Sequence, residues 1–304
     1  MKILISGASG LIGSYISERY IESGHEVIAL TRNPQKFRDK TTFSDVVKFD
    51  YESDKLPNSI NNIDLVINLT GKPLVTRWTK SNKSTIYNSR VESTKYLVKE
   101  LSRLSSPPRM LASASAIGFY SDSETTTKTE SSSNGTGYIP KLCLDWENAA
   151  LNAEEYDIKT TTLRIGIVIS KRGGALPRMI LPFKLGLGSK FGSGNQIWSW
   201  VHIEDLFRAI EHIRFNGITG PVNIVTPEPT SQSNFGRILA QTLNRPFIFK
   251  IPSIFLKMLL GEMSIELLSS KKVLPSLLTE HGFEFIYPKI NNALESEIIK
   301  TLWK

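Results

Sequence analysis

The sequence has 304 residues, of which 40% are hydrophobic and 22% charged. This composition is that of an ordinary globular protein, and it excludes a largely disordered, collagen-like or disulfide-framework chain. The formal net charge is +8, and the single cysteine, Cys143, cannot form an internal disulfide. One cysteine also excludes a multi-cysteine metal or iron–sulfur site, and it fits a reducing compartment.

The length and the interruptions of the apolar segments bear on the location of the protein in the cell. The N-terminal residues run from a short apolar strand directly into a glycine-rich turn, without the apolar region of a signal peptide. The most apolar later stretch, 251–268, is broken by Lys257 and Glu262, so it is predicted to be a core helix rather than a membrane span. We therefore expect a cytoplasmic protein with no membrane partner.

Basic residues concentrate in one segment, 72–109, which contains nine lysines and arginines and only two glutamates. A nucleic-acid site needs such a stripe together with stacking aromatic residues or a known binding module, and no module is recognisable. We interpret the segment as a solvated helix face and expect no nucleic-acid partner.

Apolar runs alternate with amphipathic segments through the first two hundred residues, a pattern typical of βαβ units around a parallel sheet. The predicted strands are 2–6, 26–30, 46–49, 65–69, 110–113 and 161–169, and the predicted helices are 11–23, 79–104 and 142–155. The predicted fold is α/β: a Rossmann-type doubly wound parallel sheet with a smaller, partly helical C-terminal substrate domain. We place the dinucleotide-binding domain at 1–170, with a later strand near 222–225 returning to it, and the smaller domain at 171–304.

The first strand is followed by GASGLIG at 7–13, which leads into an amphipathic segment. Such a loop uses glycines for the tight turn, for backbone approach to a pyrophosphate and for close helix packing, with the helix N-terminus facing the phosphates. We therefore predict a dinucleotide site there. Its predicted contacts are Gly7, Ser9, Gly10, Leu11, Ile12 and Gly13.

The end of the second predicted strand distinguishes the two nicotinamide cofactors. Thr31 and Arg32 stand where an acidic residue would bind the adenosine ribose of NAD. A guanidinium can pair with a 2′-phosphate in a forked geometry, so this position favours NADP over NAD. Asp50, after the third strand, is a candidate adenine contact, with a turn cap as the alternative.

The segment 121–137 has no aliphatic side chain to anchor it in a core. We predict a mobile surface loop. Its ends should lie beside the nicotinamide site, so it could close over a substrate as a lid does; the alternative is a surface connection without a role.

Several longer motifs follow in order: NLTG at 68–71, SASAIGFYS at 113–121 and WVHIEDL at 200–206. With the glycine loop, they resemble the extended short-chain dehydrogenase/reductases. More narrowly, GKPLVTRW at 71–78, LCLDWENAA at 142–150, GGALPRM at 173–179, KKVLPSLL at 271–278 and GFEF at 282–285 resemble the nucleoside-diphosphate-sugar epimerase-like "epimerase family" proteins, including their short C-terminal domain. The resemblance spans essentially the whole chain, and it implies cofactor contacts from Leu69, Thr70 and Gly71.

Related reductases use a serine, a tyrosine and a lysine four residues after the tyrosine, which holds the nicotinamide ribose and lowers the pKa of the phenol. Here Tyr138 stands in the tyrosine position, but Leu142 occupies the lysine position and Lys141 lies one residue early. The resemblance makes Tyr138, Lys141 and Ser115 the candidate catalytic residues. Tyr120 is a second candidate proton donor and Ser113 an alternative to Ser115, with aromatic packing as the alternative for each tyrosine.

Aromatic and basic residues provide candidate substrate contacts, because an arginine beside aromatic faces suits a planar or anionic ligand. These candidates are Arg77, Trp78, Trp198 and Trp200, and packing between the two domains is the alternative for the tryptophans. His202 precedes two acidic residues, but ligands so close on one corner do not make a metal site, so no metal is expected.

Two functions follow from the sequence. The first is an NADP-dependent oxidoreductase or epimerase acting on a small polar, sugar-nucleotide-like substrate. The second is a dinucleotide-binding sensor or interaction protein without turnover. The sequence does not determine the oligomeric state, and a homodimer is one of the states compatible with it.

Overall fold

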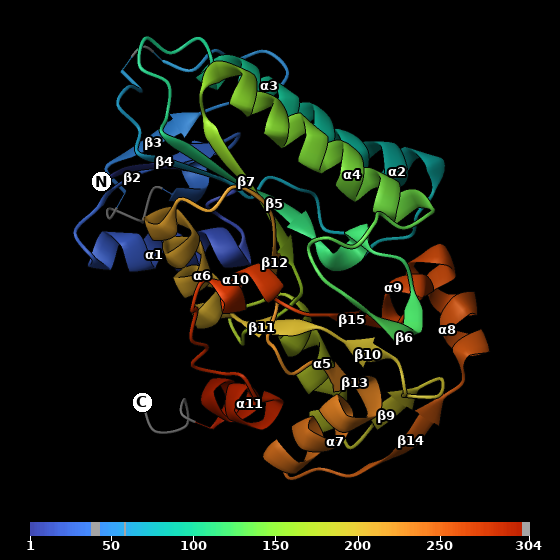
Figure 1. The fold of residues 1–304 in the computed structure, drawn as a ribbon. Helices are drawn as coiled ribbons and strands as arrows, with labels where there is room; N and C mark the ends of the chain where they lie inside the picture. The colour runs from blue at the N-terminus through green and yellow to red at the C-terminus, as the bar shows by residue number, and fades with distance from the viewer. Residues whose placement is uncertain (38–42, 58, 300–304) are drawn as a thin grey trace.

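The computed structural model describes residues 1–37, 43–57 and 59–299. Its centre is a parallel seven-stranded sheet with the strand order β12-β7-β5-β4-β1-β2-β3 (Figure 1). The strands are β1 (Lys2–Ser6), β2 (Glu26–Thr31), β3 (Asp45–Lys48), β4 (Leu65–Asn68), β5 (Met110–Ala116), β7 (Lys159–Ile165) and β12 (Gly220–Ile224). The chain winds outward in both directions from β1, so the predicted doubly wound Rossmann fold is confirmed.

Alternate residues of the strands are buried on opposite faces of the sheet. Ile3 and Ile5 of β1 belong to one apolar cluster and Leu4 to another, and all three are fully buried. Strands covered on both sides read as continuous apolar runs, which is why the sequence predicts them so directly.

Helices cover both faces of the sheet (Figure 1). The chain forms α1 (Leu11–Glu22) and α6 (Ile203–Asn216) on one side, and α2 (Lys80–Tyr87), α3 (Ser93–Leu101) and α4 (Tyr138–Leu151) on the other. The predicted helix 79–104 is therefore interrupted: a π-helical turn, Asn88–Glu92, separates α2 from α3. The helix predicted at 142–155 begins earlier, so Tyr138 lies in its first turn.

The predicted strand 161–169 is also divided. After β7 the chain leaves the main sheet at Gly166, and β8 (Ile167–Ile169) pairs with β11 (Trp200–His202) instead. A side chain at Gly166 would stand 2.7 Å from the Ser199 carbonyl oxygen, so glycine allows the two segments to approach.

The remaining elements form a smaller region beyond the carboxyl ends of the central strands (Figure 1). Its strands are β9 (Gly188–Phe191), β10 (Ile197–Trp198), β13 (Thr230–Ser231), β14 (Phe247–Ile251) and β15 (Lys271–Val273). Its helices are α5 (Ala175–Lys184), α7 (Gln232–Thr242), α8 (Ser253–Leu260), α9 (Ser264–Leu268), α10 (Ser276–Glu280) and α11 (Ile290–Ile298). Among the described residues, none of the helices combines the length and apolar character needed to cross a membrane.

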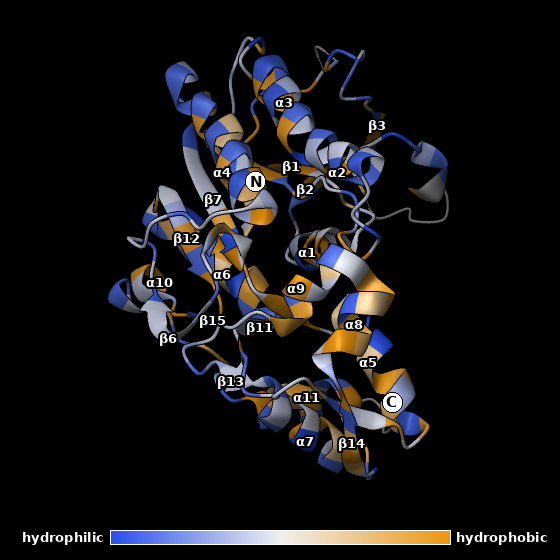
Figure 2. Ribbon diagram, turned by 90° about the vertical axis from the view of Figure 1, so that its right-hand side faces the viewer, coloured by the Kyte–Doolittle hydropathy of each residue, from blue (hydrophilic) through white to orange (hydrophobic). Residues whose placement is uncertain are grey.

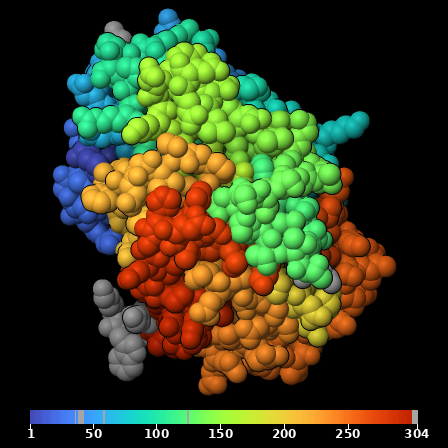
Figure 3. Space-filling view, in the orientation of Figure 1, coloured from blue at the N-terminus to red at the C-terminus, as the bar shows by residue number. Residues whose placement is uncertain are grey.

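The prediction that 121–137 is a loop without an anchor is wrong. Residues Ser123–Lys128 form β6, which pairs in parallel with β15. The carboxylate of Glu130 accepts hydrogen bonds from the backbone of Asn223 and Leu277, at 3.1 and 3.4 Å. Figure 3 shows this green segment lying against the red C-terminal part of the chain. Polar and backbone contacts anchor the segment, although it has no aliphatic side chain.

The prediction of a core helix at 251–268 is also wrong. The segment begins at the last residue of β14 and then forms two short helices, α8 and α9. A 3₁₀ turn, Gly261–Met263, joins the two helices. Figure 2 shows that much of α8 is coloured as hydrophobic. Within it, Phe255 and Met258 are 60% and 72% exposed, and Leu256 is buried. Only one side of each short helix is covered, so an apolar sequence here does not mean a buried helix.

Candidate functional site

The glycine loop between β1 and α1 is closely packed at two of its three glycines. Gly7 has a φ of +79°, and a side chain there would stand 2.7 Å from the carbonyl oxygen of Leu69. A side chain at Gly13 would stand 2.3 Å from the Gly7 carbonyl oxygen. These glycines bring the loop after β4 and the first turn of α1 against the end of β1.

The first turn of α1 is open. Gly10 is the N-cap residue, and no side chain caps the helix. Ser9 and Gly10 are exposed, and Leu11 and Ile12 are partly exposed. An uncapped helix N-terminus with exposed backbone N–H groups is suited to bind an anion such as a pyrophosphate.

Thr31 and Arg32 lie where β2 ends, on the adenosine side of such a site. The Thr31 hydroxyl accepts a hydrogen bond from Asn33 N at 3.1 Å. Arg32 is exposed, and it forms no ion pair with any residue that the structure describes. Asp50 accepts a hydrogen bond from Glu52 N at 3.3 Å, so its carboxylate caps a turn, which is the alternative that the sequence left open.

Three hydroxyl groups meet beneath the loops that follow β1, β3 and β4. Ser6 Oγ contacts both Tyr51 Oη and Thr70 Oγ1, and Thr70 Oγ1 donates to Tyr51 Oη at 3.0 Å. Burial raises the pKa of Tyr51, so its phenol is protonated at neutral pH. Tyr51 is not among the residues predicted from the sequence; the only signal for it is its place shortly after the third strand, beside Asp50.

A cavity of about 150 Å³ opens at the carboxyl ends of β5 and β7. In open α/β sheets, ligands bind outside the carboxyl ends of the strands. Its lining comes from both parts of the chain: Ala116, Ile117, Gly118, Ile165, Gly166, Ile167, Ile197, Trp198, Ser199, Glu266, Ser269 and Lys271. The arrangement is a small, largely apolar cavity with one cation and one carboxylate.

Lys271 is the cation of this cavity, and sequence reasoning assigned it no role although it begins the KKVLPSLL motif. The residue is 8% exposed, and its Nζ lies 3.6 Å from Glu266 Oε1, beyond hydrogen-bond distance. A buried ammonium beside a more exposed carboxylate can also pair with an anionic or hydroxyl group of a ligand.

The candidate serines lie in buried polar networks just below the cavity. Ser115 Oγ donates to Glu147 Oε1 at 2.6 Å, and Glu147 forms a buried ion pair with Arg164 at 2.8 Å. Ser113 is fully buried and accepts a hydrogen bond from Asn68 Nδ2 at 3.1 Å. Ser115 is therefore the serine closer to the cavity lining, since its neighbour Ala116 belongs to that lining.

Tyr120 is fully buried beneath the same region. Its hydroxyl donates to Asn223 Oδ1 at 2.7 Å and accepts from Arg164 Nη1 at 2.8 Å. Both contacts hold the phenol inside the protein, and Tyr120 does not line the cavity. The position agrees with the packing alternative for this tyrosine.

Tyr138 and Lys141 lie in the first turn of α4 but point in different directions. Tyr138 is half-buried, its hydroxyl donates to Lys83 O at 2.9 Å, and its ring packs edge-on against Trp78. Lys141 is exposed and pairs with Asp145 at 3.0 Å. The structure therefore does not bring Lys141 to Tyr138 as a catalytic pair.

The four candidate substrate residues separate in the structure. Trp198 lines the cavity, and Trp200 is 1% exposed within the apolar cluster of the smaller region. Trp78 donates from Nε1 to Leu74 O at 3.0 Å beside Tyr138. Arg77 is exposed on the same loop.

His202 has a structural role. Its Nδ1 accepts from Glu204 N and caps α6, and its Nε2 lies 3.0 Å from Glu297. Among the described residues, no group of three or more histidine, cysteine or acidic side chains is arranged to hold a metal ion.

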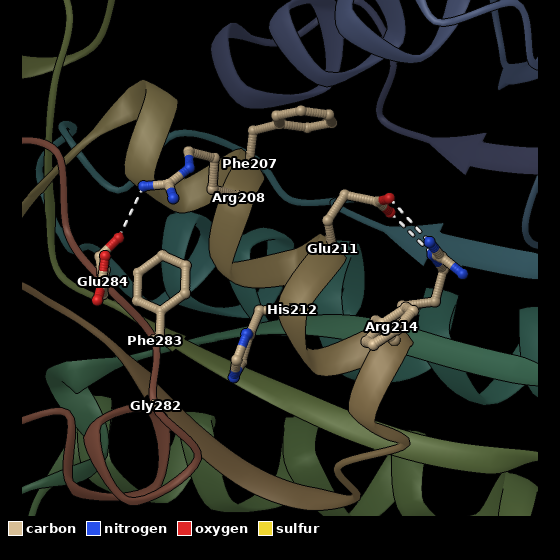
Figure 4. Close-up of a pocket in the computed structure, with 9 residues that line it drawn as sticks. Phe207, Arg208, Glu211, His212, Arg214, Gly282, Phe283 and Glu284 are labelled. Carbon is tan, nitrogen blue, oxygen red and sulfur yellow. Dashed lines mark hydrogen bonds and ion pairs between the residues drawn. The ribbon is translucent and has the colours of Figure 1, made fainter.

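A larger surface groove, of about 490 Å³, lies outside this region on the exposed side of α6 (Figure 4). Its two arginines are already engaged: Arg214 pairs with Glu211 at 2.9 Å, and Arg208 donates to Glu284 O at 2.7 Å. We therefore take the smaller cavity, which adjoins the carboxyl ends of the strands, as the candidate site.

Comparisons with protein families cover most of the chain. The model of the NAD dependent epimerase/dehydratase family matches residues 3–224, and that of a domain of unknown function, DUF1731, matches residues 251–297. An epimerase family protein of Staphylococcus saprophyticus is 36% identical over 295 residues, covering 96% of this chain and 97% of that protein. The epimerase family protein YfhF of Bacillus subtilis is 32% identical over 300 residues, covering 98% of each.

Solved structures show the same arrangement. The human epimerase family protein SDR39U1, crystallised with NADPH, matches with a TM-score of 0.87 at 26% identity, covering 98% of this chain and 99% of that one. A nucleoside-diphosphate sugar epimerase from Corynebacterium glutamicum matches with a TM-score of 0.78 at 28% identity, covering 98% of this chain and 58% of that one. MoeE5 in complex with UDP-glucose and NAD shares the fold, with a TM-score of 0.80 at 20% identity.

Proposed function

The chain belongs to the NAD-dependent epimerase/dehydratase family, and we propose that it is an NADP-dependent oxidoreductase or epimerase of the extended short-chain dehydrogenase/reductase type. Its substrate is a small polar, sugar-nucleotide-like molecule. The observation that carries the proposal is the open first turn of α1 behind Gly7 and Gly13, whose backbones leave no room for side chains. Such a turn binds a dinucleotide pyrophosphate.

The choice of NADP rests on Arg32. Its exposed guanidinium follows β2, where the adenosine ribose of a bound dinucleotide would lie. Among the residues that the structure describes, no carboxylate forms an ion pair with this guanidinium. A 2′-phosphate would supply the missing charge. The human relative crystallised with NADPH supports the same choice.

The substrate position follows from the cavity. Its lining combines residues before and after residue 170, which supports the division into a dinucleotide domain at 1–170 and a substrate domain at 171–304. We place the reacting end of the substrate there, with Trp198 as an apolar wall and Lys271 as a polar contact.

When bound, the nicotinamide accepts or donates a hydride. The protein must then exchange a proton with the substrate oxygen, and Tyr138 and Ser115 are our candidates for this role. Tyr138 would have to release Lys83 O to reach a substrate. Ser115 would orient the oxygen while its hydroxyl keeps its hydrogen bond to Glu147. Burial raises the pKa of Tyr138, so the phenol is the proton donor at neutral pH.

A specific observation favours the second function, a dinucleotide-binding sensor without turnover. Lys141 points away from Tyr138, and the lysine position itself is occupied by buried Leu142. A protein with this arrangement could bind a dinucleotide without efficient proton transfer.

One experiment separates the two functions. NADPH and NADH are titrated by fluorescence, and the NADPH complex is then tested for hydride transfer to a panel of carbonyl compounds and oxidised sugar nucleotides. Turnover supports the oxidoreductase, and tight binding without any exchange supports the sensor. If neither cofactor binds, both proposals are wrong.

A further inference from the structure

Arg90 is a buried guanidinium without a counter-ion. The residue is 8% exposed, and its Nη1 donates to Ile86 O at 3.3 Å and to Ser89 Oγ at 3.5 Å. No described carboxylate lies within 4.0 Å of it. Isolated buried charges are costly, and burial lowers the pKa of this arginine. The position therefore needs an explanation beyond stability.

The backbone around Arg90 is also unusual. The residue lies in the π-helical turn Asn88–Glu92, which interrupts the run from α2 into α3. π-Helical turns insert an extra residue into a helix and occur frequently at functional sites. Here the turn directs Arg90 toward α4 and the loop that follows β4.

On α4, Arg90 meets the face where the lysine of related reductases would stand. Tyr138, Leu142 and Trp146 are successive residues four apart, so they share one face of the helix. The Arg90 Cζ lies 5.3 Å from the centre of the Trp146 ring, and its charge acts on the Tyr138 phenol at the other end of the stripe. The guanidinium therefore lies along the face to which Leu142 belongs.

The free edge of this guanidinium is turned to the predicted cofactor loop. A side chain at Gly71 would stand 3.1 Å from Arg90 Cζ, 3.2 Å from Nη2 and 3.4 Å from Nε. Among the described residues, Nε and Nη2 have no hydrogen-bond partner. Gly71 is exposed, so two adjacent N–H donors lie at the surface of the loop that follows β4.

We propose that Arg90 replaces the missing lysine, with its Nε–Nη2 edge donating to the vicinal hydroxyls of the nicotinamide ribose beside Tyr138. An arginine presents two parallel donors and suits a pair of neighbouring oxygens, whereas a lysine offers a single point charge. The inference rests on the proposed function, because it needs a bound dinucleotide. It explains together the unpaired buried charge, the π-helical turn and the glycine at position 71.

The test compares two ligands that differ in the nicotinamide half. The binding of NADPH and of adenosine 2′,5′-bisphosphate, which lacks the nicotinamide ribose, is measured by calorimetry for Arg90→Met, Arg90→Lys and the unaltered protein. We expect Arg90→Met to weaken NADPH binding about tenfold to a hundredfold. Affinity for the bisphosphate should change by less than about twofold, and Arg90→Lys should recover part of the loss because it keeps the charge.

Lys95→Met provides a matched control. Lys95 is an exposed cation in the first turn of α3, where it pairs with Glu92 at 2.9 Å. Its removal should leave the affinity for both ligands unchanged.

Several results would overturn the inference. Equal losses for both ligands would show that Arg90 acts on the fold or the adenosine half, and unchanged NADPH binding would place it outside the site. If Arg90→Met does not fold, Gly71→Ala provides the test, because its methyl group would press on the guanidinium and should weaken NADPH selectively. If the unaltered protein binds the bisphosphate but not NADPH, the inference fails; if it binds neither ligand, the proposed function itself fails.

Discussion

Gly10 is the position where a substitution should separate cofactor binding from folding. Its φ of −76° and ψ of 172° are extended values that a β-branched residue adopts. A side chain there would have one near neighbour, the Gly7 carbonyl oxygen at 3.3 Å. Gly10→Val should therefore leave the fold intact, while its methyl groups occupy the space of a bound pyrophosphate.

The two effects differ in size. Valine is a poorer N-cap than glycine, which costs about 1 kcal/mol of stability and lowers the melting temperature by about 2–4 °C. Displacing the pyrophosphate loses at least two charge-assisted hydrogen bonds, together about 3 kcal/mol, so NADPH affinity should fall by more than about a hundredfold.

Calorimetric titration with NADPH and thermal unfolding measure these quantities on the same samples. Gly24→Val is the control at the other end of α1: its φ of +75° makes it strained, but nothing lies within 4 Å of the added side chain. It should lower the melting temperature and leave NADPH affinity unchanged. If Gly10→Val binds NADPH as the unaltered protein does, the dinucleotide site does not lie at the first turn of α1.

Three further predictions concern other residues of the site. Arg32→Ala should reduce the preference for NADPH over NADH by about tenfold to a hundredfold in the same titration, because one charged contact to the 2′-phosphate is lost; equal affinity of the unaltered protein for both cofactors would contradict the assignment. Glu147→Ala should lower the free energy of unfolding by about 3–5 kcal/mol in denaturant unfolding, because it leaves the Arg164 guanidinium buried without a counter-ion. Adding Arg164→Met to this variant should recover part of the lost stability. If Glu147→Ala alone costs less than about 1 kcal/mol, water replaces the lost partner. Cys143 should resist alkylation in the folded protein, because burial raises the pKa of its thiol to about 12; rapid modification without unfolding would show that this part of α4 opens.

The central sheet was predictable because both faces of its strands are apolar. The strands are recognisable as short apolar runs, and the predicted ends lie close to those observed. Apart from the divided strand 161–169, the largest difference is at β5, which continues to Ala116 past the predicted end at residue 113. Ser115 in this extension is buried, and its hydroxyl has a partner, Glu147, more than thirty residues away in the sequence. A strand whose polar side chains are satisfied by distant residues cannot be recognised from an apolar pattern.

The two wrong predictions share a cause. Composition alone does not decide whether a segment is anchored, because packing and pairing depend on the residues that lie opposite it. The segment 121–137 has no aliphatic residues, yet β6 finds a strand partner in β15 and Glu130 finds backbone donors. The apolar α8 has Leu256 buried and most of its other apolar residues exposed, because the smaller region covers only one side of it.

The same limit explains why the sequence points to Lys141 and misses Arg90. A motif gives the position of a side chain along the chain, and by that measure Lys141 is one residue from the expected lysine. In the helix, one residue is a rotation of about 100°, enough to turn Lys141 to solvent and to Asp145. Arg90 lies about fifty residues away, in a basic segment that the sequence identifies as solvated, yet the π-helical turn and the glycine at position 71 bring its guanidinium to the face of Leu142. When a family motif lacks its charged residue, the replacement should therefore be sought among buried charged side chains that have no counter-ion and that face the same side of the helix.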